Sequence, residues 1–204
     1  MTSISCDIVL LPSTDLAQKA TTLSEQLSQF GGQFVLKDGE YFPHLSLYMA
    51  QLKNDDLGTI KEFLAKVATK TPAFELTANR YFQSHGYIDV EYQRTSALDY
   101  LQHMIITRIN PFRDGLLDMD RMRLRTAVGS VKDNLESYGY ASVGELFRPH
   151  MTFTRLNTRE PIGTNDFPGL NYFNGAYTKL GLFELDSNNS CIRKIAEFKL
   201  TNGA

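Results

Sequence analysis

Pro149-His150-Met151-Thr152-Phe153 and, in the first half of the chain, Pro43-His44-Leu45-Ser46-Leu47 share one pattern: proline, histidine, an apolar residue, a hydroxyl residue and a second apolar residue. The chain has only four histidines and seven prolines among 204 residues, so chance predicts well under one Pro-His pair. Two such pairs with matched flanks predict a duplicated unit with a paired function.

Both segments have the pattern of strands, on which alternate side chains point to opposite faces. Strict alternation puts His44, Ser46 and Tyr48 on one face and the apolar residues between them on the other. The same parity groups His150 with Thr152. Because the apolar face must meet a core, we expect each histidine to stand beside a hydroxyl on a face that is free to line a cleft.

The rest of the chain alternates between helical and strand patterns. Helical periodicity covers 14–30, 54–67, 96–109 and, less regularly, 119–138. Strand patterns cover 4–11, 44–52, 74–82, 87–92, 150–156, 177–185 and 192–200. Each half thus supplies helices, a motif-bearing strand and a strand hairpin, and no long linker divides the halves. We expect an α+β, bilobal duplicated fold, with two antiparallel sheets flanked by helices around a central cleft, and with residues 1–204 forming one domain.

Composition narrows the classes of partner. The net charge of -2 and the pI near 6.1 argue against a protein that binds extended nucleic acid, which would normally carry a strongly basic face. The apolar run from Ile8 to Leu11 is far too short for a signal or membrane segment, so we expect a cytoplasmic protein with no membrane partner. Cys6 and Cys191 lack metal-ligand spacing and are expected to be plain buried thiols. The oligomeric state has no signal in the sequence.

Two imidazoles and two hydroxyls in one cleft are suited to cleaving a phosphodiester without a metal or other cofactor. Histidine has an unperturbed pKa of about 6.5, so near neutral pH one ring can be the base while its partner is the acid. The pattern leaves open whether His44 or His150 is the base. The hydroxyls of Ser46 and Thr152 are expected to donate hydrogen bonds to phosphate oxygens.

The paired motifs His44-Leu45-Ser46-Leu47 and His150-Met151-Thr152-Phe153 resemble those of the two-histidine phosphoesterases, which include 2′,3′-cyclic phosphodiesterases and 2′-5′ RNA ligase-like proteins. The resemblance implies a bilobal fold, metal-independent chemistry on a small nucleotide or an RNA terminus, and catalytic roles for the four motif residues. It also suggests that Arg155 contacts substrate, although strict alternation would turn this residue away unless a bulge intervenes. Tyr48 has the parity to stack on a base, with ordinary packing as its alternative.

Other functions stay open at this point. The same cleft could belong to a nucleotide- or RNA-binding module without turnover, or the two histidines could be structural. A metallohydrolase lacks support because the chain has no His-Glu-x-x-His element, and a serine hydrolase because no Gly-x-Ser-x-Gly elbow surrounds Ser46.

Overall fold

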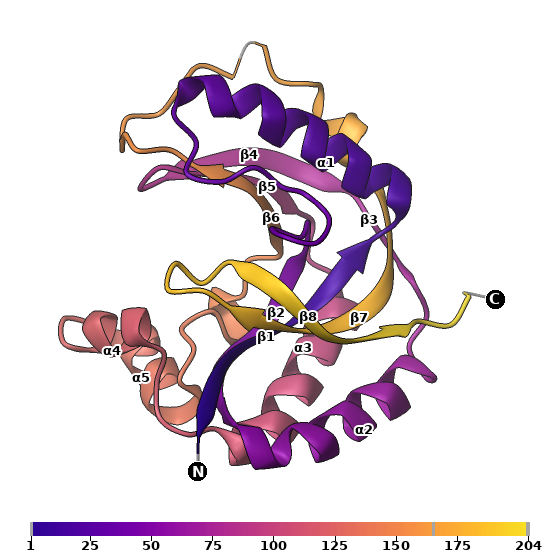
Figure 1. The fold of residues 1–204 in the computed structure, drawn as a ribbon, viewed down its shortest axis with the longest axis vertical. Coiled ribbons are helices and arrows are strands. Elements are labelled where there is room, and N and C mark those ends of the chain that lie inside the picture. The colour runs from indigo at the N-terminus through magenta and orange to yellow at the C-terminus, as the bar shows by residue number, and fades with distance from the viewer. Residues whose placement is uncertain (1, 165, 203–204) are drawn as a thin grey trace.

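Two antiparallel sheets form the framework of the protein, as a computed structural model covering residues 2–164 and 166–202 shows (Figure 1). The larger sheet has the order β2-β1-β7-β3, with β8 also paired to β7, and the smaller has the order β4-β5-β6. The strands of the larger sheet are β1 (Ser3–Pro12), β2 (Leu45–Lys53), β3 (Phe74–Leu76), β7 (Gly175–Leu185) and β8 (Cys191–Lys199). Those of the smaller sheet are β4 (Ala78–Ser84), β5 (Tyr87–Tyr92) and β6 (His150–Arg155).

The helices flank the sheets, and the first and third of them begin at side chains that cap them. They are α1 (Thr14–Leu27), α2 (Leu57–Ala68), α3 (Ser96–Ile109), α4 (Asp118–Leu124) and α5 (Gly129–Tyr138). The Ser13 hydroxyl accepts a hydrogen bond from the Leu16 amide at the start of α1, and Thr95 does the same for Leu98 at α3. The region 119–138, predicted as one helix, is two helices joined by a short turn.

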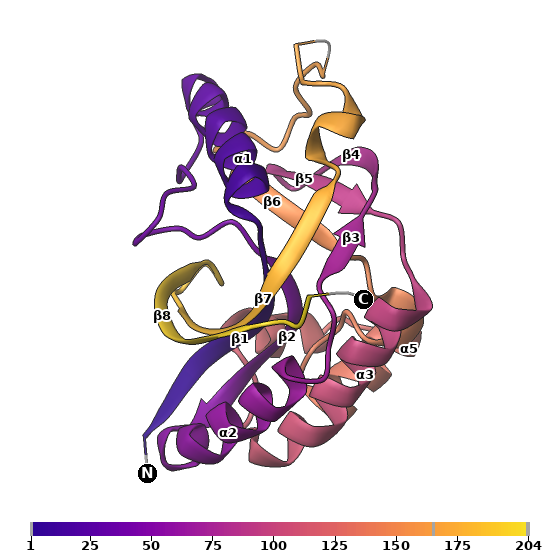
Figure 2. The same ribbon diagram turned by 90° about the vertical axis from the view of Figure 1, so that its right-hand side faces the viewer.

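The two halves of the chain exchange their first helices. α1 follows β1 in sequence but packs against β6 of the smaller sheet, whereas α3 follows β5 but packs against β2 of the larger sheet. Figure 1 shows α1 above the smaller sheet and α2 and α3 below the larger one, and Figure 2 gives the same layers from the side. Each lobe therefore buries residues from both halves, which ties the lobes together through a shared core.

A β-bulge interrupts the first motif strand directly after its hydroxyl residue. Ser46 pairs with Val9 and Tyr48 pairs with Ile8, so Leu47 is the extra residue on β2. Neighbouring residues on β1 face opposite sides, and Tyr48 is therefore turned away from the face that carries Ser46.

The second motif strand has a bulge at the corresponding position. Thr152 pairs with Asp89 and Thr154 pairs with Ile88, which makes Phe153 the extra residue on β6. Arg155 pairs with Tyr87 and so returns to the face of Thr152. The bulges thus give both motifs the same local geometry.

Candidate active site

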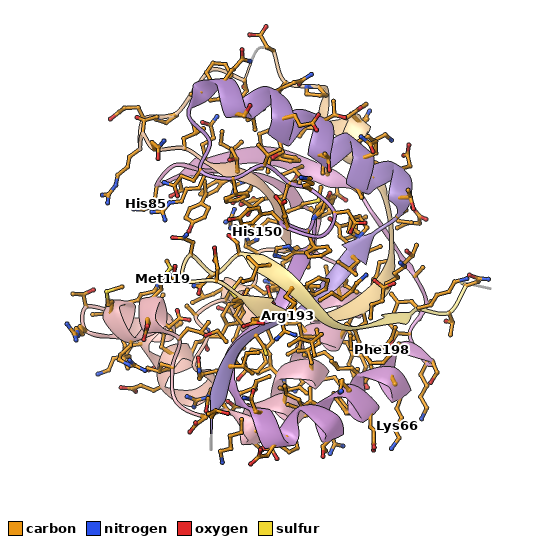
Figure 3. The ribbon with its side chains drawn as sticks, viewed as in Figure 1. Lys66, His85, Met119, His150, Arg193 and Phe198 are labelled. Atoms are coloured by element: carbon orange, nitrogen blue, oxygen red, sulfur yellow. The ribbon has the colours of Figure 1, made fainter. Side chains whose placement is uncertain are left out.

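A cleft of about 580 Å³ lies between the two sheets and brings both motifs together. Its lining includes His44 and Ser46 from the larger sheet and His150 and Thr152 from the smaller one. Figure 3 shows His150 between the lobes. Segments separated by most of the chain therefore present their histidines to one space.

The first unit is built on β1 and β2. The Nδ1 atom of His44 lies 2.6 Å from the Phe42 carbonyl, to which it donates, and this leaves Nε2 as the free ring nitrogen. The Ser46 hydroxyl donates to Oδ2 of Asp7 at 2.6 Å. Nε2 of His44 is also 3.7 Å from Oδ2 of Asp7 and 3.7 Å from Sγ of Cys191.

The second unit on β5 and β6 repeats this arrangement. The Nδ1 atom of His150 donates to the Arg148 carbonyl at 2.6 Å, and the Thr152 hydroxyl donates to Oδ1 of Asp89 at 2.8 Å. Each unit is therefore a histidine anchored through Nδ1 to the carbonyl two residues earlier, followed by a hydroxyl that is bound to an aspartate on the neighbouring strand.

The two aspartates differ in their electrostatic surroundings. Asp89 pairs with the Arg148 guanidinium at 3.0 Å, and the same guanidinium pairs with Glu91 at 2.5 Å. Asp7 is fully buried, and within the described residues its Oδ1 has no hydrogen-bond partner. Burial raises the pKa of Asp7 to about 8, partly offset by the Ser46 hydroxyl.

Burial also shifts the pKa of the first histidine, His44. It lowers the pKa of His44 to about 4; the hydrogen bond to the Phe42 carbonyl opposes this shift, and the nearby His150 adds to it. His44 is therefore neutral at neutral pH, with an unprotonated Nε2.

The hydroxyls do not take the orientation expected from the sequence. Ser46 and Thr152 both donate to aspartates instead of toward the cleft, because β1 and β5 each place an acceptor beside them. A donated bond to phosphate from either hydroxyl would need that proton to be redirected.

The prediction that Tyr48 contacts substrate is wrong. Its side chain is fully buried, and its hydroxyl donates to the Tyr138 carbonyl at 2.7 Å, with the Asn110 side chain 3.1 Å away. The bulge at Leu47 is the physical reason, because it turns Tyr48 into the core and places Met49 at the cleft instead.

Arg155 lies at the cleft, as expected if a bulge interrupts the alternation of the strand. It lines the cleft, and its guanidinium stacks 4.8 Å from the centre of the Tyr87 ring. Its Nε is buried and has no hydrogen-bond partner among the described residues. An N–H donor in that condition at a cleft wall is suited to an anion.

Sequence reasoning missed Asp7, Asp89, Arg148 and Cys191. A signal existed for the aspartates, since each stands between two apolar residues of a strand, in Cys6-Asp7-Ile8 and Ile88-Asp89-Val90. An acidic side chain in such a run needs a buried partner. No comparable local signal points to Cys191, which reaches His44 only through the folding of β8.

The fold matches solved structures of LigT from E. coli over nearly the whole of both chains. The structure with phosphate has a TM-score of 0.59 at 15% identity, covering 99% of this chain and 100% of that one. The structure with 3′-AMP gives 0.61 at 15%, covering 98% and 100%, and one described as a phosphoesterase gives 0.60 at 15%, covering 98% and 100%. These matches confirm the predicted α+β fold and its resemblance to the two-histidine phosphoesterases at the level of the fold.

A family model described as a protein of unknown function, DUF1045, matches residues 49–161. The match spans more than half of the chain and includes His150 and Thr152, and the protein belongs to this family. Curated protein sequences give no match. Within the described residues, none of the helices is both long and apolar enough to cross a membrane.

Proposed function

We propose that the protein is a metal-independent phosphodiesterase that opens a 2′,3′-cyclic phosphate, or cleaves or joins a 2′-5′ phosphodiester, at a nucleotide or RNA end. The observation that carries the proposal is the pair of matched units facing one cleft. In both units, Nδ1 is committed to a backbone carbonyl, so each histidine offers Nε2 for proton transfer.

The surroundings of the two rings favour a division of roles. Desolvation keeps His44 neutral, and its free Nε2 can accept a proton from water as a general base. His150 lies on the smaller sheet, beside the Asp89 and Arg148 network, and takes the role of general acid. Water attacks phosphorus, a P–O bond to the ribose breaks, and Nε2–H of His150 protonates the departing oxygen.

Arginines supply the charge that a phosphate needs in the cleft. The Nε atom of Arg155 has no hydrogen-bond partner in the part of the chain that the structure describes, and Arg123 from α4 also lines the cleft. Aromatic rings in the lining, including the stacked pair Phe34 and Tyr41 with centroids 5.2 Å apart, offer an apolar surface for a base. LigT, whose fold is similar, has been solved with phosphate and with 3′-AMP, which agrees with a nucleotide-sized ligand here.

The test is hydrolysis of the four nucleoside 2′,3′-cyclic phosphates and a 2′-5′-linked dinucleotide in excess chelator. We expect His44→Ala and His150→Ala each to reduce kcat by about 10²–10⁴-fold, the usual contribution of one general acid or base. His103→Ala is the matched control, because His103 is exposed on α3. Tight 3′-AMP binding by an inactive wild type would instead indicate a binding module. Activity unchanged in both motif variants would overturn the proposal.

A further inference from the structure

A second chemical feature overlaps the first unit: three different metal-ligating groups meet at His44. Ligand atoms of Asp7, His44 and Cys191 all lie within 4.8 Å of one another, and Nε2 of His44 is 3.7 Å from both Oδ2 of Asp7 and Sγ of Cys191. The three residues come from β1, the segment before β2 and the start of β8, so tertiary structure alone brings them together. We call this group the Asp-His-Cys cluster.

The spacing fits a tetrahedral ion. Bonds to zinc of about 2.0–2.3 Å place neighbouring ligand atoms about 3.3–3.8 Å apart in a tetrahedron. The two distances of 3.7 Å fall in this range, and the ligand atoms of Asp7 and Cys191 lie within 4.8 Å of each other. Nδ1 of His44 already donates to the Phe42 carbonyl, which is the arrangement that orients a metal-binding imidazole through its other nitrogen.

The Oδ1 atom of Asp7, which has no hydrogen-bond partner among the described residues, gives a second reason to place a cation here. In the second unit, the Arg148 guanidinium neutralises Asp89. In the first, His44 is the only basic side chain of the described residues within ion-pair distance of Asp7, and Oδ1 of this fully buried carboxyl has no partner. A metal ion would supply the positive charge that an arginine supplies at the other unit.

We propose that the Asp-His-Cys cluster binds one thiophilic divalent cation, of which Zn²⁺ is the model, and that binding switches the cleft off. On binding, the Cys191 thiol and the Asp7 carboxyl would release their protons to solvent. The resulting thiolate and carboxylate, with the imidazole of His44, form a ligand set that zinc accepts, with a water in the fourth position. The inhibition follows because the ion takes the lone pair of Nε2 that His44 needs as a base. This consequence rests on the proposed function, whereas the metal site does not.

The first experiment measures Zn²⁺ binding to the metal-free full-length chain by titration calorimetry, and Co²⁺ binding by absorption. We expect one ion per chain and a thiolate-to-cobalt charge-transfer band. Cys191→Ala should abolish the band and weaken Zn²⁺ binding at least on the order of 10-fold to 100-fold, the cost reported even for losing an outer partner of a ligand. Cys6→Ala is the matched control, since Cys6 is an equally buried cysteine outside the cluster.

Additional variants keep the result interpretable. His44→Ala should lose the ion as well, and His150→Ala should retain it, with circular dichroism checking the fold of each variant. A wild type that binds no ion, or a folded Cys191→Ala that binds as tightly as the wild type, would overturn the site.

The inhibitory consequence is tested by comparing the activity with and without Zn²⁺ within each variant. The wild type and Cys6→Ala should lose activity on adding Zn²⁺, and Cys191→Ala should not. Cysteine-dependent binding by a chain that hydrolyses no phosphodiester would support the site and refute the proposed function. An active chain whose Zn²⁺ inhibition survives Cys191→Ala would refute the switch alone.

Discussion

Arg148→Met tests how the second unit is held together. The change removes a guanidinium that bonds to Asp89 at 3.0 Å and to Glu91 at 2.5 Å and lies 4.4 Å from the centre of the Phe82 ring. Each charge-assisted bond contributes about 1.5–3 kcal/mol, and the cation–π contact about 0.5–1 kcal/mol. Because the arginine side chain is 35% exposed, screening reduces the sum, and we expect a loss of about 2–4 kcal/mol of unfolding free energy.

The assay is urea unfolding at pH 7 followed by circular dichroism. Arg80→Met is the control, because Arg80 pairs with Glu91 from an exposed position and its loss should be clearly smaller. Adding Asp89→Asn to Arg148→Met should recover part of the stability, since no buried charge at residue 89 is then left without a partner. A loss within about 0.5 kcal/mol of wild type would refute the reasoning, because surface pairs alone show such values.

Three further changes probe the cleft and its walls. In thermal unfolding, Asp120→Asn should be more stable than wild type by about 1–3 kcal/mol at pH 8 and equal to it at pH 3.5. The reason is that burial raises the pKa of Asp120 to about 6. The stability that the protonated carboxyl contributes in the wild type is therefore lost as the pH rises from about 4 through 6. A constant difference between those pH values would contradict this. Arg155→Met should lower kcat/KM for a cyclic nucleotide about 10-fold to 100-fold, mainly through KM, whereas an unchanged KM would remove Arg155 from substrate binding. Tyr48→Phe should cost about 0.5–1.5 kcal/mol in urea unfolding and leave KM unaltered, since it removes one hydrogen bond to the Tyr138 carbonyl outside the cleft. A raised KM would restore its substrate role.

Local patterns predicted most of the secondary structure because capping and periodicity are properties of short segments. The helix expected over 96–109 has those bounds, and the hairpin of β7 and β8 turns where Ser187-Asn188-Asn189-Ser190 indicates. The exchange of helices between lobes was not predictable in this way. It depends on which sheet offers α1 an apolar face, and that face is formed by residues far from α1 in the sequence.

The motif residues of the candidate site could be identified from their repetition. The side of the sheet on which the later residues of each strand lie could not be predicted. Alternation predicted Tyr48 in the cleft, and a bulge of one residue reversed it. The equivalent bulge on β6 brought Arg155 into the cleft, against alternation and in agreement with the resemblance. A bulge leaves no clear trace in composition, because Leu47 and Phe153 are the apolar residues that an uninterrupted strand would also carry.

The matched geometry of the two units makes one aligned difference between them informative. The residue two positions before the histidine supplies the carbonyl that anchors Nδ1 in both units, but its side chain is Phe42 in one and Arg148 in the other. The arginine keeps a cation beside Asp89, whereas the phenylalanine leaves Asp7 buried without one and belongs to the apolar surroundings of His44. Desolvation keeps the imidazole of His44 neutral at neutral pH and therefore available as the base. Under the proposed function, a duplicated motif thus acquires two different proton-transfer roles from a side chain outside its own signature.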